Sequence, residues 1–256
     1  MTPAFSIVIP ARYASTRLPA KPLREIAGQP MIQRVHQQAL QAGAERVIVA
    51  TDHPAIAEVV AGFGGEVMMT ARDHPSGTDR LQEVARRCGF GDDHILVNVQ
   101  GDEPLIPPAV ILQVAANLAA HPEAAVATLS EVIASEADFH NPNIVKVVCD
   151  SRGLALYFSR APIPWPRDLQ PTGQGGLAPG FSPQRHLGIY AYRVGVLNQF
   201  VTWPPAPLET LECLEQLRFL WQGFAIHVAE ACAPVPGGVD TEGDLVRVAA
   251  IVEASL

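Results

Sequence analysis

The segment FSIVIPARYASTRLPAKP, residues 5–22, is the strongest indication of how this chain folds. Its first five residues form an apolar run that predicts a buried strand. A loop after the first strand of an α/β sheet lies at the carboxyl end of that strand, where such folds bind ligands. Between Ala11 and Arg24 there are four cations and no carboxylate, in a chain whose formal net charge is −8. Such a loop suits a polyphosphate, because guanidinium groups pair bidentately with phosphate oxygens; a solvated basic loop is the alternative.

The size and composition of the chain limit the class of protein to which it can belong. Its 256 residues suffice for one large α/β domain or two small ones, and 48% hydrophobic with 17% charged residues is typical of a globular protein. No apolar run reaches the ~18 residues of a membrane span, and the N-terminus lacks the pattern of a secretory signal, so we expect no membrane partner. The acidic balance argues against nucleic acid as a partner, but a nucleotide needs only local positive charge.

The cysteines indicate the redox compartment. They are widely spaced and form no C-x-x-C pair, at Cys88, Cys149, Cys213 and Cys232. This spacing argues against a zinc site and against a disulfide framework. It fits a reducing cytosol, and we expect a cytoplasmic protein.

In the first half of the chain, strands and helices alternate. Buried strands are predicted at residues 5–9, 46–50, 66–69, 95–99 and 125–129, and helices at residues 31–40, 78–87 and 107–120, with a further helix that begins near Pro54. This alternation predicts an α/β fold with a mostly parallel, doubly wound sheet.

The second half of the chain lacks this regular alternation of strands and helices. Residues 144–148 and 154–158 flank a turn and predict a β-hairpin, with Lys146 on the exposed face of its strand. A strand is predicted at 186–193 and another at 226–229. A leucine stripe predicts one continuous helix over 208–221, and Thr241 or Glu242 begins a last helix. We expect a single domain, 1–256, with a β-rich subdomain inserted at about 131–206; no role is assigned to the Pro- and Gly-rich residues 166–184.

Two aspartates are candidate magnesium ligands. Asp102 follows the strand that ends at Val99, and an aspartate at the carboxyl end of a central strand is well placed to hold Mg²⁺ against a phosphate. Asp240 follows a double glycine near the C-terminus, where backbone can approach a ligand. Facing the basic loop, the two carboxylates would bracket a metal–triphosphate. The alternative for each is a capping role at a helix or turn.

Further polar residues are candidates for nucleotide and sugar contacts. Residues 70–80 form a polar connection before a helix, and they can either recognise a base or phosphate or simply cap that helix. Arg160, His186 and Tyr190 could hold an acidic sugar through its carboxylate and hydroxyls. Glu212, Glu215 and Gln216 are expected on the polar side of the helix at 208–221. Each of these residues, taken singly, is more often a structural polar group.

Nine ordered sequence blocks carry a resemblance that covers nearly the whole chain: IPARYASTRLPAKPL, ATDHPAIAEVV, HPSGTDR, VNVQGDEPLIP, NPNIVKVV, ALYFSRAPIPW, RHLGIYAYR, PLETLECLEQLR and PGGVDTEGDL. The chain resembles the 3-deoxy-manno-octulosonate cytidylyltransferases, also called CMP-Kdo synthetases. The resemblance implies a Rossmann-like nucleotidyltransferase fold whose inserted subdomain serves dimerisation and sugar binding, a homodimer, and Mg²⁺ as cofactor. It implies transfer of CMP from CTP to Kdo, an eight-carbon acidic sugar of lipopolysaccharide, with diphosphate as the second product.

The resemblance also implies roles for individual residues. Ala11, Arg12, Arg17 and Lys21 match the triphosphate loop, Ser76 and Arg80 match the nucleotide side, and Gln100 matches a position that contacts both ligands. Asp102 and Asp240 match the magnesium carboxylates; together with Arg12 and Lys21 they form the implied catalytic set. The sugar side is matched by Arg160, His186, Tyr190, Glu215 and Gln216. Where the family often has Thr-Arg-Ala-Asp-His, residues 70–74 of this chain are Thr-Ala-Arg-Asp-His, so no role is carried over to Arg72.

Two other functions remain alternatives at the level of sequence. The same chemistry could act on another acidic sugar, such as an amino-Kdo or a sialic acid, and the residues between His186 and Gln216 would decide this. A catalytically silent nucleotide-binding module is the other alternative. The pair of Asp102 and Asp240 speaks against it, because a pure binder has little need of two metal carboxylates.

Overall fold

A computed structural model describes residues 3–14, 18–168 and 177–254 of the chain. The strands are β1 (Phe5–Ala11), β2 (Glu25–Ile26), β3 (Gln29–Pro30), β4 (Arg46–Thr51), β5 (Glu66–Met69), β6 (Ile95–Asn98), β7 (Val126–Val132), β8 (Lys146–Cys149), β9 (Ala155–Ser159), β10 (Gln184–Arg193) and β11 (Ile226–Glu230). The helices are the 3₁₀ turn η1 (Lys21–Leu23), α1 (Met31–Gln41), α2 (Pro54–Gly62), α3 (Gly77–Cys88), α4 (Pro108–Ala120), α5 (Glu136–His140), α6 (Val194–Phe200), α7 (Pro207–Glu212), α8 (Leu217–Trp221) and α9 (Glu242–Glu253).

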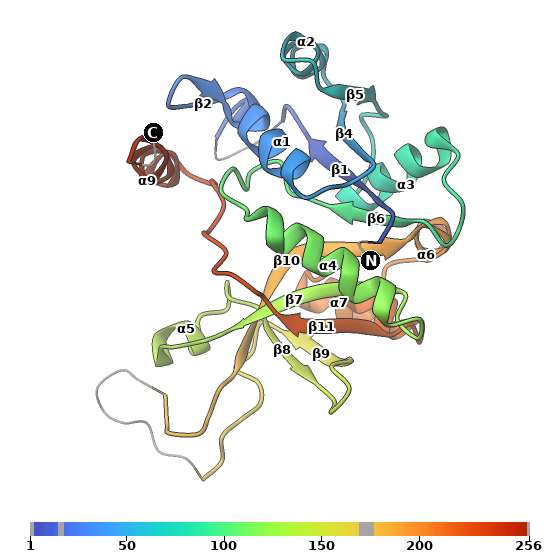
Figure 1. Ribbon diagram of the computed structural model, residues 1–256. Coiled ribbons are helices and arrows are strands. Elements are labelled where there is room, and N and C mark those ends of the chain that lie inside the picture. Colours follow the sequence, from blue (N-terminus) through green and yellow to red (C-terminus); the bar gives the residue numbers. More distant parts are fainter. Residues whose placement is uncertain (1–2, 15–17, 169–176, 255–256) are drawn as a thin grey trace.

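One large sheet runs through the molecule in the order β11-β7-β10-β6-β1-β4-β5 (Figure 1). The strands β6, β1, β4 and β5 run parallel to one another, and β11 runs parallel to β7. Strand β10 lies antiparallel between β6 and β7. The sheet is therefore mixed and mostly parallel, and its parallel part places the ends of β1 and β6 side by side.

Helices cover both faces of this sheet because side chains on a strand alternate between the two faces. On one face Ile7 and Ile9 pack with residues of α1, α2 and α4. On the other face Val8 packs with residues of α3, α6 and α8. This arrangement confirms the predicted doubly wound α/β architecture. None of the helices within the described ranges is long and apolar enough to cross a membrane.

The β8–β9 hairpin is confirmed, whereas the predicted environment of Lys146 is wrong. The two strands pair antiparallel, from Lys146 opposite Ser159 to Cys149 opposite Ala155. The Lys146 side chain is fully buried, and its ammonium donates to the carbonyls of Asn141, Ile144 and Arg160 at 3.0, 2.6 and 2.7 Å. These three acceptors use all the hydrogens of the ammonium, which is the condition under which a lysine can be buried.

The continuous helix predicted over 208–221 is wrong. Cys213 adopts a left-handed conformation with φ of 51° and ends α7, and α8 begins only at Leu217. The leucines of the stripe recur every three residues, which drifts away from the 3.6-residue period of an α-helix; Leu211 is accordingly 81% exposed. Glu212, Glu215 and Gln216 therefore do not share one helical face.

The C-terminal helix α9 returns to the N-terminal half of the molecule. After β11, an extended segment crosses to the region of β2, where α9 packs (Figure 1). Leu245 and Val248 of α9 join Leu18, Ile26 and Met31 in a small apolar cluster, and Arg24 forms a two-bond ion pair with Glu242 at 2.7 and 2.9 Å. This crossing carries Asp240 to the end of β1. The division into a core and an inserted subdomain at about 131–206 stays a prediction; β10, which falls in that range, is a central strand of the main sheet.

Candidate active site

A cleft of about 410 Å³ opens at the carboxyl ends of β1 and β6. It is lined by Pro10, Ala11, Arg12, Ala14, Lys21, Pro22, Gly77, Gln100, Gly101, Asp102 and Asp240. Six of these residues were predicted from sequence as site residues: Ala11, Arg12, Lys21, Gln100, Asp102 and Asp240. They come from three distant parts of the chain, which meet where parallel strands end, as expected for this class of fold.

Two glycines allow the segments of the cleft to approach. A Cβ atom on Gly101 would lie 2.8 Å from the carbonyl oxygen of Pro10, so only glycine lets the loop after β6 lie against the end of β1. A Cβ atom on Gly238 would lie 3.0 Å from the carbonyl oxygen of Asp102. The next residue, Val239, donates its N–H to that carbonyl at 2.8 Å. The two close approaches bring Asp240 beside Asp102.

Lys21 lies between the two aspartates. Its Nζ donates to Oδ2 of Asp102 at 2.6 Å and to Oδ1 of Asp240 at 3.0 Å, and its side chain is 15% exposed. Burial alone would lower the pKa of Lys21, but the two carboxylates outweigh it and raise the pKa above its ordinary value. The oxygens of both aspartates thus converge on one positive charge.

Neither aspartate caps a helix, so the helix-capping alternative is wrong for both. Thr241, not Asp240, caps α9: its side chain accepts the N–H of Asp244, and the Asp244 side chain in turn accepts the N–H of Thr241. The first helix after Asp102 is α4, which begins at Pro108 with Pro107 at its N-cap. Asp102 and Asp240 therefore have their side chains in the cleft for a reason other than helix capping.

The donor set of the cleft fits magnesium. Within the residues that the structure describes, there is no cluster of three or more His, Cys, Asp or Glu side chains that could hold a metal. Two carboxylates are nevertheless what Mg²⁺ commonly takes from a protein, because substrate phosphates and water complete its shell. The convergence of Asp102 and Asp240 on the Lys21 ammonium shows that a cation fits between them.

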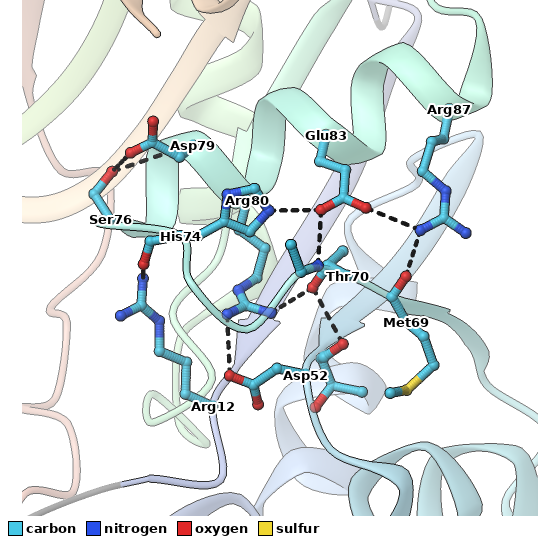
Figure 2. Close-up of polar contacts among 12 residues, drawn as sticks. Arg12, Asp52, Met69, Thr70, His74, Ser76, Asp79, Arg80, Glu83 and Arg87 are labelled. Carbon is cyan, nitrogen blue, oxygen red and sulfur yellow. Dashed lines mark hydrogen bonds and ion pairs between the residues drawn. The ribbon is translucent and has the colours of Figure 1, made fainter.

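The basic loop contributes Arg12 as a second cation to the cleft. Its guanidinium donates to the carbonyl of His74 at 3.3 Å (Figure 2). Arg17, predicted to belong to the same set, lies outside the described residues. Arg24, the fourth cation of the stretch, is paired with Glu242 instead.

Ser76 and Arg80, predicted for the nucleotide side, hold the segment that leads into α3 (Figure 2). Ser76 caps α3, since its Oγ accepts the N–H of Asp79 at 3.2 Å, which confirms the capping role considered for this segment. Arg80 has no exposed side-chain surface. Its guanidinium donates to Oγ1 of Thr70 and, at 3.2 Å, to Oδ2 of Asp52, and burial lowers its pKa.

Some sugar-side candidates gather around β10. His186 shares a contact of 3.0 Å between its Nε2 and Oγ1 of Thr128, and burial lowers its pKa to about 3, so the ring is neutral at pH 7. Its ring lies 5.2 Å from that of Tyr190, whose pKa is raised well above the ordinary value by burial. Gln100 donates to the carbonyl of Gly188 at 3.4 Å, which joins the cleft to the same strand.

The remaining sugar-side candidates lie around the break between α7 and α8. The Arg160 guanidinium donates to the carbonyls of Glu212, Pro142 and Cys213, at 2.6, 3.0 and 3.4 Å. Glu215 accepts a hydrogen bond from Thr78, and burial raises its pKa. Gln216 is buried. These contacts tie α3, the β8–β9 hairpin and the 212–216 segment to one another.

Two polar groups near the cleft were not predicted. Asp52 accepts from Arg80 and, at 3.4 Å, from the N–H of Tyr13, so it ties the basic loop to α3; its place directly after the strand that ends at Thr51 was a usable signal. Glu103 follows Asp102, and burial, with a smaller effect of the Asp102 charge, raises its pKa to about 8. Its burial could not be seen in the sequence, because the loop that covers it depends on tertiary packing.

The chain is similar to proteins of known activity over its whole length. A family model described as cytidylyltransferase matches residues 6–227. A 3-deoxy-manno-octulosonate cytidylyltransferase from Cellvibrio japonicus is 64% identical over 251 residues, which cover 98% of each chain. Another, from Pseudomonas syringae pv. syringae, is 58% identical over 253 residues, covering 99% of this chain and 100% of the relative.

Solved structures show the same similarity to cytidylyltransferases. A CMP:2-keto-3-deoxy-manno-octonic acid synthetase complexed with CTP superposes with a TM-score of 0.89 at 44% identity, covering 99% of this chain and 100% of that one. A nucleotidyl transferase from Methanothermobacter thermautotroptrophicus, at 18% identity and a TM-score of 0.61 over 99% of both chains, shares the fold. The comparisons confirm the predicted nucleotidyltransferase fold and the family that the sequence blocks indicated.

Proposed function

The chain belongs to the 3-deoxy-manno-octulosonate cytidylyltransferase family, and from this premise we propose which of its side chains carry out the reaction. The enzyme is a cytidylyltransferase that uses CTP to activate Kdo for lipopolysaccharide biosynthesis. The observation that carries the proposed assignment is the meeting of Lys21, Asp102 and Asp240 at the end of β1 and β6.

The reaction is an in-line displacement at phosphorus. The anomeric hydroxyl oxygen of Kdo attacks the α-phosphorus of CTP, and the bond from that phosphorus to the bridging oxygen of the β-phosphate breaks. Diphosphate leaves, and the hydroxyl gives its proton to solvent water. No covalent enzyme intermediate is required, because positioning and neutralisation of charge lower the barrier. Arg12, Arg17 and Lys21 stabilise the negative charge that accumulates on the departing diphosphate.

Asp102 and Asp240 hold Mg²⁺ in this proposal. When bound, the ion supplies Lewis-acid polarisation of phosphate and sugar oxygens and lowers the pKa of the attacking hydroxyl. The mixed charge of the cleft supports the assignment, since Lys21 keeps the two carboxylates together and oriented toward one point.

The substrate contacts divide between the two sides of the cleft. Ser76 and Arg80 bind the nucleotide, together with Ala11 and Gln100 on the wall of the cleft. The residues that bind the sugar are Gln100, Arg160, His186, Tyr190, Glu215 and Gln216. The neutral His186 and the protonated Tyr190 suit hydroxyl groups. We also propose a homodimer in the cytoplasm; sedimentation at twice the 27.4 kDa mass of the chain would support the dimer, and sedimentation at the single mass would refute it.

We expect the enzyme to release diphosphate from CTP far faster with Kdo as the acceptor than with N-acetylneuraminate. The physical reason is that His186 and Glu215 are partly buried, and a sugar that leaves such polar groups unpaired binds poorly. The measurement is diphosphate release in the presence of CTP and Mg²⁺ across a panel of acidic sugars. Equal or reversed rates for the two sugars would reject the proposed sugar side.

A further inference from the structure

The loop that precedes α3 is held by side chains of that same helix (Figure 2). Glu83 lies two turns into α3, and its carboxylate accepts the N–H of Ala71 at 2.9 Å and Nε2 of His74 at 2.5 Å. Arg87, one turn further on, donates to Oε1 of Glu83 at 3.1 Å and to the carbonyl of Met69. Residues 69–74, called here the α3 loop, are therefore tied to the helix at several points.

Glu83 is an ionised acceptor in this arrangement. Its side chain is 13% exposed, and burial alone would raise its pKa; the hydrogen bonds from Ala71, His74 and Arg87 outweigh burial and lower the pKa below its ordinary value. Because an ionised carboxylate only accepts, Nε2 of His74 carries the hydrogen of their contact. The His74 ring is thereby fixed in one orientation.

The α3 loop is in turn the support of Arg12. The guanidinium of Arg12 donates to the carbonyl of His74 at 3.3 Å, and Arg12 lines the cleft, whereas Glu83 and His74 do not. A chain of contacts thus runs from Glu83 through His74 to a cation of the cleft. Arg80 holds Thr70 at the other end of the loop, so the loss of Glu83 releases mainly the end that carries His74.

We propose that Glu83 is a positioning residue for CTP: it fixes His74, and through the His74 carbonyl it orients Arg12 without touching the nucleotide. The inference rests on the proposed function, in which Arg12 binds the triphosphate. A cation held in one orientation binds phosphate without first losing its rotamer freedom, and that advantage disappears when its support moves.

The test compares the KM for CTP with the KM for Kdo in four single variants of the full-length enzyme, Glu83→Gln, Glu83→Ala, His74→Phe and the control Glu58→Ala. Glu58 is an exposed glutamate of α2 outside this network. We expect Glu83→Ala to raise the KM for CTP about tenfold, with the KM for Kdo within about twofold of the parent. Glu83→Gln keeps an acceptor for the Ala71 N–H and should raise the KM for CTP less. The control Glu58→Ala should leave the KM for CTP unchanged.

The double variant Glu83→Gln/His74→Phe distinguishes a linked pair from two separate effects. If the two residues act as a unit, its KM for CTP is no higher than that of the worse single variant. Should Glu83→Ala fail to fold, Glu83→Gln and His74→Phe carry the test. An unchanged KM for CTP in both, or equal rises in the two KM values, overturns the proposal, because a merely structural residue would affect both substrates.

A fifth single variant, Arg12→Ala, separates this inference from the proposed function. If Arg12→Ala leaves the KM for CTP unchanged, the assignment of Arg12 to the nucleotide fails and the role of Glu83 fails with it. If Arg12→Ala raises that KM while the Glu83 and His74 variants do not, the positioning role alone is refuted.

Discussion

Asp102→Asn and Asp240→Asn are each expected to abolish most turnover. Each change removes one of two carboxylates that converge on a single point in the cleft, and loss of metal assistance is worth several kcal/mol, or at least about 100-fold in rate. The double variant should be little worse than either single one, as for residues that act as a unit. The measurement is magnesium-dependent diphosphate release from CTP and Kdo.

Thermal melting is the control for these aspartate variants. Thr241 caps α9 and Pro107 precedes α4, so neither aspartate supports a helix end and the melting temperature should change little. Full magnesium-dependent activity in either single variant would eliminate the two-carboxylate site. A large drop in melting temperature with normal activity of the folded fraction would instead assign the residue to stability.

Lys21→Ala is expected to lower kcat/KM roughly 10- to 150-fold, which corresponds to the 1.5–3 kcal/mol of a hydrogen bond to a charged group. The ammonium is the one described group that donates to both Asp102 and Asp240. Without it the two carboxylates repel each other. The measurement is steady-state kinetics with CTP and Kdo.

The fold should survive Lys21→Ala, since η1 is a short turn and Pro22 supplies its buried contact. The matched control is Arg24→Ala, which removes a nearby cation that pairs with Glu242 outside the cleft and should leave kcat/KM close to that of the parent. If Lys21→Ala melts far below the parent yet turns over normally when folded, Lys21 is a structural residue.

The basic loop, the strand–helix alternation and the hairpin could all be predicted because each depends on residues close in sequence. An apolar run such as 95–99 is buried wherever the chain folds into a sheet. A hydrophobic period of two residues identifies a strand and one of 3.6 residues a helix, and both periods can be seen in the residues of the element itself. The same local logic failed at 208–221, where the stripe of leucines is interrupted by the left-handed Cys213. Nothing next to Cys213 in the sequence forces that conformation; Arg160, 53 residues away, donates to the carbonyl of Cys213.

The class of fold, the family and the two candidate aspartates could be inferred from the sequence, because motif and periodicity are properties of neighbouring residues. The contact of Asp240 with Asp102 through Lys21, the burial of Lys146 and the support that Glu83 gives to the loop behind Arg12 are visible in the folded chain alone. The burial and the partner of a charged group depend on segments that are brought together across the sheet, and these are not neighbours in sequence. Lys21 and Asp240 are 219 residues apart in sequence and are neighbours in the folded chain, in which α9 packs against β2.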